Sequence, residues 1–410
     1  MAQLSDDCFA FGGALLPLAE AQARIADLHN TVSGVEDVAL AESCGRILAY
    51  DLSAAIDLPP WNNSAVDGYA VHHADLDPNV PTDLPVSGRI AAGGAMVAAP
   101  RGTAIRIFTG AVMPEGPDTV MMQEDCEVTP AGVRFAPGIR KGANQRPVGE
   151  DVARGAVALA AGKRLMPPDI GLLAALGIEQ VAVRRPLRVA VFSTGDEITL
   201  PPAPLRPGKI YDANRPMLAA LLRRLGAEVI DGGILPDNVD ATAAALSAIS
   251  ADLIFTSGGV SAGEEDHVRT AIERAGELAF WRVAIKPGRP VALGRIGATP
   301  LLGLPGNPVA ALVTFTALGR PLLDRLAGAT YVPPVRFTVA SRFAYRKKAG
   351  RLEYVRVVLG PDGASRYPKE GAGVLTSLTE SDALMELPEA MTALTPGELV
   401  PCIALGLLYG

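Results

Sequence analysis

Between residues 186 and 330, short apolar runs alternate with segments of helical length and spacing. The predicted strands are 187–192, 228–234, 253–256 and 301–302, and the predicted helices are 214–225, 241–249, 264–275 and 309–326. Strands that alternate with helices of this length form βαβ units, whose strands run parallel. We therefore expect an α/β domain with a parallel sheet and helices on both of its faces.

The two flanking regions show strand patterns with few helices. Short alternating segments broken by glycine and proline lie at 86–90, 103–108, 119–122 and 132–135. After Pro333 and Pro334, strand-like segments follow one another at 336–341, 352–359, 383–387 and 399–404. These patterns predict a β-rich domain before the α/β domain and a small β-barrel or sandwich after it.

The first sixty residues, and the stretch between the β-rich and α/β domains, have a mixed pattern. Apolar residues at helical spacing predict a helix over 17–28. A strand is predicted over 36–40, followed by a short helix over 46–49. Asp169 has the position of an N-cap for another helix, which ends near Gly177.

Composition narrows the class of protein. A chain of 410 residues is too long for one hydrophobic core, and 49% hydrophobic against 20% charged residues is typical of folded domains. The net charge is −7 and the longest basic run is 346–348, which counts against a nucleic-acid partner. The longest apolar run, 309–318, is too short to cross a bilayer, so no membrane association is expected.

The four cysteines are far apart and show neither a paired nor a Cys/His ligand spacing. A structural zinc site or a disulfide framework is therefore not expected. Reduced thiols, together with an N-terminus that carries Asp6 and Asp7 in place of a basic signal region, favour a cytoplasmic protein.

Loops rich in glycine and polar residues follow the predicted strands of the α/β domain. In open α/β sheets a ligand binds beyond the carboxyl ends of the strands, where such loops meet. Glycine backbone N–H groups and a helix N-terminus both favour an anion, which makes the loop before the third helix a candidate phosphate cradle. The residues of this cradle are Ser257, Gly258, Gly259, Ser261 and Gly263. A Gly-Gly turn is also compatible with a tight connection that binds nothing.

Three carboxylates in these loops, Glu197, Asp237 and Asp266, would repel an anionic ligand. A hard divalent cation with oxygen ligands, most simply Mg²⁺, would allow such side chains and a phosphate to share one site. The alternative is that Glu197 and Asp266 only cap helices.

Several common enzyme motifs are missing. The chain has no G-x-x-x-x-G-K-[ST] segment, and no G-x-G-x-x-G segment follows a strand, which counts against an ordinary NTPase or dehydrogenase. No G-x-S-x-G elbow follows a strand either, so a serine hydrolase triad lacks support.

A series of motifs, in order, resembles one family. Segment 62–70, NNSAVDGYA, resembles the family's DNSAMDGYA segment, and 106–111 with 122–124 resembles its second signature. The other matching segments are 192–197, 210–214, 257–263, 284–290 and 303–308. On these motifs the chain is identified as a member of the molybdopterin molybdenumtransferase family, whose eukaryotic relatives form the C-terminal part of gephyrin.

The resemblance implies an elongated homodimer whose subunits have four domains. It implies a discontinuous α+β linker domain over 1–60 and 141–185, and a β-rich domain with the DGYA motif over 61–140. It also implies an α/β molybdopterin-binding domain over 186–330, similar to molybdopterin adenylyltransferase, and a C-terminal β-barrel over 331–410. The implied site lies between the α/β domain of one subunit and the DGYA domain of the other.

The resemblance also implies an activity. Members combine adenylylated molybdopterin with molybdate in a Mg²⁺-dependent step that releases AMP and the molybdenum cofactor, and molybdopterin adenylyltransferase is the implied delivery partner. The implied catalytic residues are Asp67, Thr109, Glu197, Asp237, Asp266 and Lys286, with the metal on Glu197, Asp237 and Asp266. Besides the cradle, the implied ligand-binding residues are Arg282, Lys286, Pro305, Gly306, Asn307 and Pro308.

The chain departs from the family pattern at a few positions, and two other functions stay open. Arg282 stands where members often have lysine, Asn62 replaces an aspartate, and the segment before Gly149 has fewer arginines than is common. A molybdopterin adenylyltransferase would share the α/β domain and its Gly-Gly-Val-Ser loop. A gephyrin-like scaffold would retain the loops without activity. The DGYA and C-terminal domains favour the transferase, and the lack of a long linker counts against the scaffold.

Overall fold

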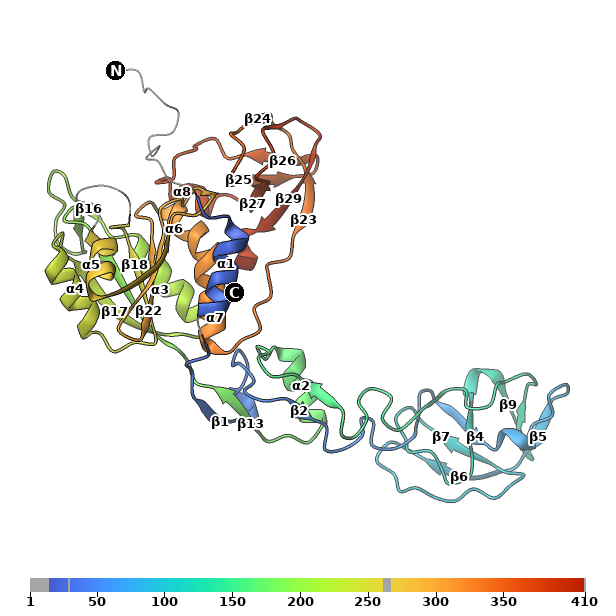
Figure 1. The fold of residues 1–410 in the computed structure, drawn as a ribbon. Coiled ribbons are helices and arrows are strands. Elements are labelled where there is room, and N and C mark those ends of the chain that lie inside the picture. The colour runs from blue at the N-terminus through green and yellow to red at the C-terminus, as the bar shows by residue number, and fades with distance from the viewer. Residues whose placement is uncertain (1–14, 29, 261–266, 409–410) are drawn as a thin grey trace.

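The chain forms an elongated molecule with a narrow middle. The structure, a computed structural model, describes residues 15–28, 30–260 and 267–408. Figure 1 shows the β-rich lobe that contains β4 (Gly68–Val71) at one end and the α/β and C-terminal domains at the other. Within the described residues, no helix is both long and apolar enough to cross a membrane.

The sheet of the α/β domain has six strands in the order β17-β14-β18-β22-β21-β19. Their bounds are Glu228–Leu235, Arg188–Thr194, Leu253–Ser257, Thr299–Leu304, Ala292–Ile296 and Gly276–Trp281. The first four strands are parallel, but β21 is antiparallel to both of its neighbours. The prediction of a parallel sheet is therefore wrong at this edge. Only two residues join β21 to β22, which is too short for a crossover helix and forces the chain to reverse.

Helices cover both faces of this sheet. On β14, Val189 and Val191 belong to one apolar core, while Ala190 and Phe192 belong to another, as the two-residue period of a strand requires. The helices α4 (Val239–Ala248) and α5 (His267–Ala275) pack in the second core, and the start of the predicted helix 264–275 lies outside the described residues.

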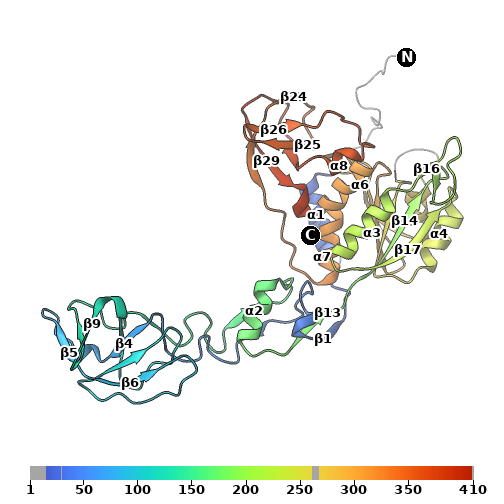
Figure 2. The same cartoon turned by 180° about the vertical axis from the view of Figure 1, so that it is seen from behind.

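The other face carries α3 (Asn214–Arg224) and a long interrupted helix. The predicted helix 309–326 consists of α6 (Pro308–Thr314), a π-helical segment (Phe315–Gly319) and α7 (Arg320–Ala327). Both views place α1 (Leu18–Leu28), α6 and α7 between the sheet and the C-terminal strands (Figure 1 and Figure 2). In α1, Ala21 and Ile25 are buried in this core, so α1 packs on the α/β domain although the chain then leaves for the middle region.

The C-terminal strands form a six-stranded sheet that includes a strand from the preceding domain. The order is β20-β25-β27-β29-β23, and β26 pairs with β25. The bounds are Ile285–Lys286, Leu352–Gly360, Ala383–Leu387, Leu399–Ala404, Phe337–Ala340 and, for β26, Gly363–Arg366. A bridge between Ser341 and Ala364 joins the end of β23 to β26, so the strands close into a ring. The apolar residues Val357, Met385 and Cys402 fill its interior.

The β-rich lobe contains two sheets of three or more strands. One has the order β6-β7-β4-β8, with β6 (Val86–Ile90), β7 (Ala104–Ile107) and β8 (Thr119–Met122) around β4. The other is β5-β10-β9, over Thr82–Leu84, Gly132–Phe135 and Cys126–Thr129. Ile105, Ile107 and Val120 are buried in the core of the lobe.

The narrow middle is built from small paired strands and one helix. β1 (Val35–Ala39) pairs with β13 (Gln180–Arg184), and α2 (Pro167–Ala175) lies beside them. The predicted helix 46–49 is wrong, because Ile47 and Leu48 form bridges to other strand segments. Asp169 is not the N-cap of α2 either, since it lies inside the first turn and accepts the backbone N–H of Met166 at 2.8 Å.

Candidate functional site

The loops at the carboxyl ends of β14, β18 and β22 enclose a cavity of about 580 Å³, which we call the strand-end cavity. The lining residues that were predicted from the sequence are Glu197, Asp237, Ser257, Gly258, Gly259, Pro305, Gly306, Asn307 and Pro308. They come together because the strands are parallel and deliver their loops to one edge of the sheet. Ser261, Gly263 and Asp266 lie outside the described residues.

Asn214, at the start of α3, ties the cradle together. Its side-chain Nδ2 donates to Ser257 Oγ at 2.7 Å and to the carbonyl oxygen of Gly306 at 2.6 Å. The side chain therefore joins the last residue of β18 to the loop that follows β22. The individual role of Asn214 was not predicted from the sequence, although the residue lies in the matching segment 210–214.

The backbone of the cradle requires glycine at position 258. Gly258 has φ +100°, and a Cβ added there would lie 2.4 Å from Thr194 Oγ1. No other residue type avoids both the strain and the overlap. The loops thus approach each other closely, and the backbone N–H of Gly258 donates to the carbonyl oxygen of Leu304 at 2.9 Å.

The two described carboxylates of the predicted metal set line the same cavity. Asp237 Oδ2 accepts the backbone N–H of Asp196 at 2.8 Å, which fixes the Asp237 side chain relative to the loop after β14. The Glu197 carboxylate lies directly over Gly195, where an added Cβ would be 2.3 Å from Oε2. Among the described residues, no three His, Cys, Asp or Glu side chains are grouped closely enough to hold a metal ion by themselves.

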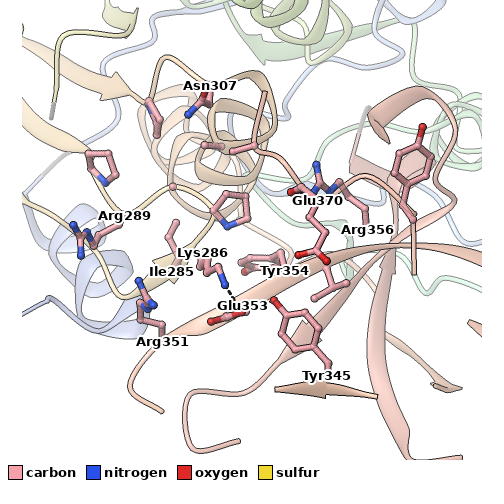
Figure 3. A pocket seen from close by; sticks show the side chains of 18 of the residues that line it. Ile285, Lys286, Arg289, Asn307, Tyr345, Arg351, Glu353, Tyr354, Arg356 and Glu370 are labelled. Carbon is pink, nitrogen blue, oxygen red and sulfur yellow. Dashed lines mark hydrogen bonds and ion pairs between the residues drawn. The ribbon is translucent and has the colours of Figure 1, made fainter. Parts of the chain in front are cut away.

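A second cavity, of about 320 Å³, lies at the seam between the α/β and C-terminal domains, and we call it the seam cavity (Figure 3). Pro290, Pro305 and Asn307 line both cavities, so the two adjoin. The cationic residues that line the seam cavity are Lys286, Arg289, Arg351, Arg356 and Arg366, against two acidic ones, Glu353 and Glu370. This excess of positive charge suits an anion.

Lys286 is a predicted site residue that lines the seam cavity and not the strand-end cavity. Its side chain is half exposed, and Nζ contacts Glu353 Oε2 at 3.1 Å. The arginines contributed by the C-terminal domain were not predicted, because their positions depend on how that domain packs against the loop after β20.

Arg282 is not among the described residues that line either cavity. Arg282 is buried, with 7% of its surface exposed, and its guanidinium lies over the Trp281 ring, 4.1 Å from the centroid. The same indole donates its N–H to the carbonyl oxygen of Val260 at 2.6 Å. Arg282 therefore stacks on the ring that anchors the cradle loop, and its predicted contact with an oxyanion stays a prediction.

Asp67 and Thr109 contact each other in the β-rich lobe. Asp67 Oδ1 accepts both the backbone N–H and the hydroxyl of Thr109, each at 2.8 Å. The backbone N–H contributes most to lowering the pKa of Asp67, followed by the hydroxyl, so the group stays ionised. The strands around this pair lie at the opposite end of the molecule from β18 (Figure 1), so one chain does not bring the pair to the strand-end cavity.

Two arginines near this pair were not predicted from the sequence. Arg106 lies over the rings of Tyr69 and Phe108, at 4.9 Å from each centroid, and Arg89 lies over Phe108 at 4.7 Å. Arg106 belongs to the second signature segment, which is the only signal in the sequence that points to it. The lobe thus presents positive charge beside an ionised carboxylate.

The fold and the cavities define a multidomain α/β protein with adjoining acidic and cationic hollows at one sheet edge. Three family models match almost the whole chain: the MoeA N-terminal region (domain I and II) over 16–177, a probable molybdopterin-binding domain over 190–325, and the MoeA C-terminal region (domain IV) over 338–405. Along the chain, the first model covers the β-rich lobe and most of the middle region, the second covers the α/β domain, and the third covers the C-terminal sheet.

Curated relatives are similar in sequence to this chain over most of their own lengths. A molybdopterin molybdenumtransferase of Haemophilus influenzae is 38% identical over 94% of this chain and 98% of its own. The relative of that name from Nostoc is 38% identical over 88% of this chain and 87% of its own. A crystal structure of the molybdopterin biosynthesis MoeA protein from Pyrococcus horikoshii superposes with a TM-score of 0.81 at 30% identity, over 95% of this chain and 100% of that one. The chain belongs to the molybdopterin molybdenumtransferase (MoeA) family.

Proposed function

We propose that this chain acts in molybdenum cofactor biosynthesis as a molybdopterin molybdenumtransferase, which inserts molybdate into adenylylated molybdopterin and releases AMP. Family membership supports the reaction class. The observation that carries the proposal is the adjacency of the strand-end cavity and the seam cavity, which share Pro290, Pro305 and Asn307.

The two cavities suit different parts of the reactants. The strand-end cavity, with its glycine-rich cradle, suits a phosphate, as glycine-rich loops at strand ends do elsewhere. The cationic lining of the seam cavity suits the compact dianion molybdate, with Lys286 as a point charge and the arginines as planar donors. Adenylylated molybdopterin bound in the strand-end cavity would then lie next to molybdate bound in the seam cavity.

Mg²⁺ is proposed to bind at the strand-end cavity, on Glu197 and Asp237 with Asp266 as a further ligand. The fit rests on two carboxylates in one wall, since hard oxygen donors are the ligands that this cation prefers. A bound Mg²⁺ would neutralise charge on the phosphoanhydride. The cradle would orient the phosphates in the same cavity.

A homodimer is proposed to complete the site. Strand β4, which begins directly after Asp67, lies at the far end of the same chain (Figure 1), so a second copy would have to present its β-rich lobe to the strand-end cavity. The lobe would then add the Asp67 carboxylate and the nearby Arg106 charge. Delivery of the adenylylated substrate by a molybdopterin adenylyltransferase is proposed as the preceding step.

One assay tests the proposed function. The purified chain is incubated with adenylylated molybdopterin, Mg²⁺ and molybdate, and released AMP is measured against reactions without molybdate. Molybdate-dependent AMP release is the expected result. Formation of adenylylated molybdopterin from ATP and molybdopterin would instead identify an adenylyltransferase. Inactivity in both assays would favour a non-catalytic scaffold.

A further inference from the structure

The loop that carries Lys286 is held by the C-terminal domain. β20 adds to the edge of the C-terminal sheet, where Ile285 lies opposite Leu352 and Lys286 lies opposite Glu353. The backbone N–H of Leu352 donates to the carbonyl oxygen of Ala284 at 2.9 Å. A residue of the α/β domain therefore takes its position from a different domain.

A buried carboxylate receives the Lys286 ammonium. Glu353 is only 2% exposed, and its Oε2 accepts from Lys286 Nζ at 3.1 Å and from the Tyr345 hydroxyl at 3.0 Å. Burial, followed by the Glu353 charge, raises the pKa of Tyr345, so the phenol keeps the proton that it donates. Figure 3 shows the Lys286 ammonium directed at Glu353 within the seam cavity.

Stabilisation of the fold alone does not explain the ion pair between Lys286 and Glu353. Glu353 Oε1 is buried and has no hydrogen-bond partner among the described residues, and an unsatisfied buried oxygen costs free energy. The lysine it pairs with is half exposed to the cavity, where screening weakens an ion pair. Other cations of the same wall have internal partners, since Arg356 donates to Ser377 and to the carbonyl oxygen of Gly371.

We propose that Glu353 is a positioning residue, which with Tyr345 holds the Lys286 ammonium at the wall of the seam cavity where the oxyanion substrate binds. Glu353 thereby contributes to the reaction without touching the reacting atoms. This inference rests on the proposed function, because it assigns a role within the same site.

A double-mutant cycle tests the positioning role. Glu353→Gln preserves shape but removes the charge, and we expect kcat/KM for molybdate to fall at least about tenfold. In a Lys286→Met background the same change should cause no further fall, because the group it positions is gone. Equal losses in the two backgrounds, or a wild-type value for Glu353→Gln, would overturn the proposal. Tyr345→Phe should give a smaller loss in the same parameter, because it removes one of the two donors to Glu353.

Thermal unfolding separates this role from a general loss of stability. Lys286→Met alone leaves a buried carboxylate without its cation and should lower the unfolding temperature, whereas Lys286→Met with Glu353→Gln should recover it without recovering activity. Asp324→Asn is the matched control, because Asp324 is a 3% exposed carboxylate that pairs with Arg320 at 2.7 Å outside both cavities. It should reduce stability and leave kcat/KM unchanged. Recovery of activity in the Lys286→Met, Glu353→Gln variant would contradict the proposal.

Chemical labelling of lysines tests the positioning of Lys286 independently of the reaction. If the wild-type chain releases no AMP with molybdate, the proposed function fails, and the positioning is read from trace acetylation of lysines followed by mass spectrometry. Glu353→Gln should increase labelling of Lys286 relative to the exposed Lys348, because the amine is no longer held in an ion pair. An unchanged ratio would show that Glu353 does not hold Lys286.

Discussion

Asp237 and Asp196 hold each other across two strand ends. The backbone N–H of Asp196 donates to Asp237 Oδ2 at 2.8 Å, and the backbone N–H of Asp237 lies 3.4 Å from Asp196 Oδ1. This reciprocal pair links the loops after β14 and β17. It holds the Asp237 carboxylate in the wall of the strand-end cavity, in the loop adjoining that of Glu197.

The first prediction concerns this carboxylate. Asp237→Asn keeps an oxygen that can accept the Asp196 N–H, so the fold should be retained, but it removes the charge proposed to hold Mg²⁺. AMP release should fall on the order of a hundredfold, with partial recovery at high Mg²⁺ concentration. Unfolding temperature serves as the control for structure. Wild-type activity at low Mg²⁺ would exclude Asp237 from the metal site.

The second prediction concerns the close approach at Gly258. Gly258→Ala places a methyl group against Thr194 at a positive φ, so it should cost about 1–3 kcal/mol of stability and abolish AMP release. Gly208→Ala is the matched control, because Gly208 has φ +82° with no atom within 4 Å of an added Cβ. Its cost should be about 1 kcal/mol, with activity retained. Denaturant unfolding and the AMP assay measure both effects.

The third prediction concerns the titration of Asp67. The backbone N–H and then the hydroxyl of Thr109 lower the pKa of Asp67, so Thr109→Val should move this pKa back toward its ordinary value. A lowered pKa means that the interaction is present above the unfolded-state pKa and is lost as pH falls through the folded-state value. The acid limb of the activity profile should therefore shift to higher pH in Thr109→Val. A profile that keeps its acid limb would show that another group controls it.

The fourth prediction tests whether two copies share a site. Asp67→Asn and Glu197→Gln should each be inactive, because each removes one half of the proposed composite site. When equal amounts are dissociated and reassociated together, about a quarter of wild-type activity should return, since mixed dimers contain one intact site. Light scattering should show a dimer before and after mixing. Failure of mixed dimers to recover activity would contradict a site shared between two copies.

The hydrophobic pattern was sufficient to predict most of the α/β domain. Helix α3 and strands β14, β17 and β18 lie within one or two residues of the predicted ranges, because their apolar periods agree with their burial. The glycine loop and the acidic residues were predictable as neighbours because parallel strands deliver them to one edge. Strands β19 and β21 were missed, because a short antiparallel return has no distinct signal in a stretch rich in glycine and proline.

The sequence by itself determined the family, the local elements and the residue types at the strand-end loops, because these depend on short-range pattern and on motifs. Only the tertiary structure decided where Lys286 lies, since its partner Glu353 is 67 residues further along and belongs to another domain. It also decided that Asp67 is separated from Glu197 within one chain. Such relationships arise from packing between distant segments, which leaves no periodic signal in either segment.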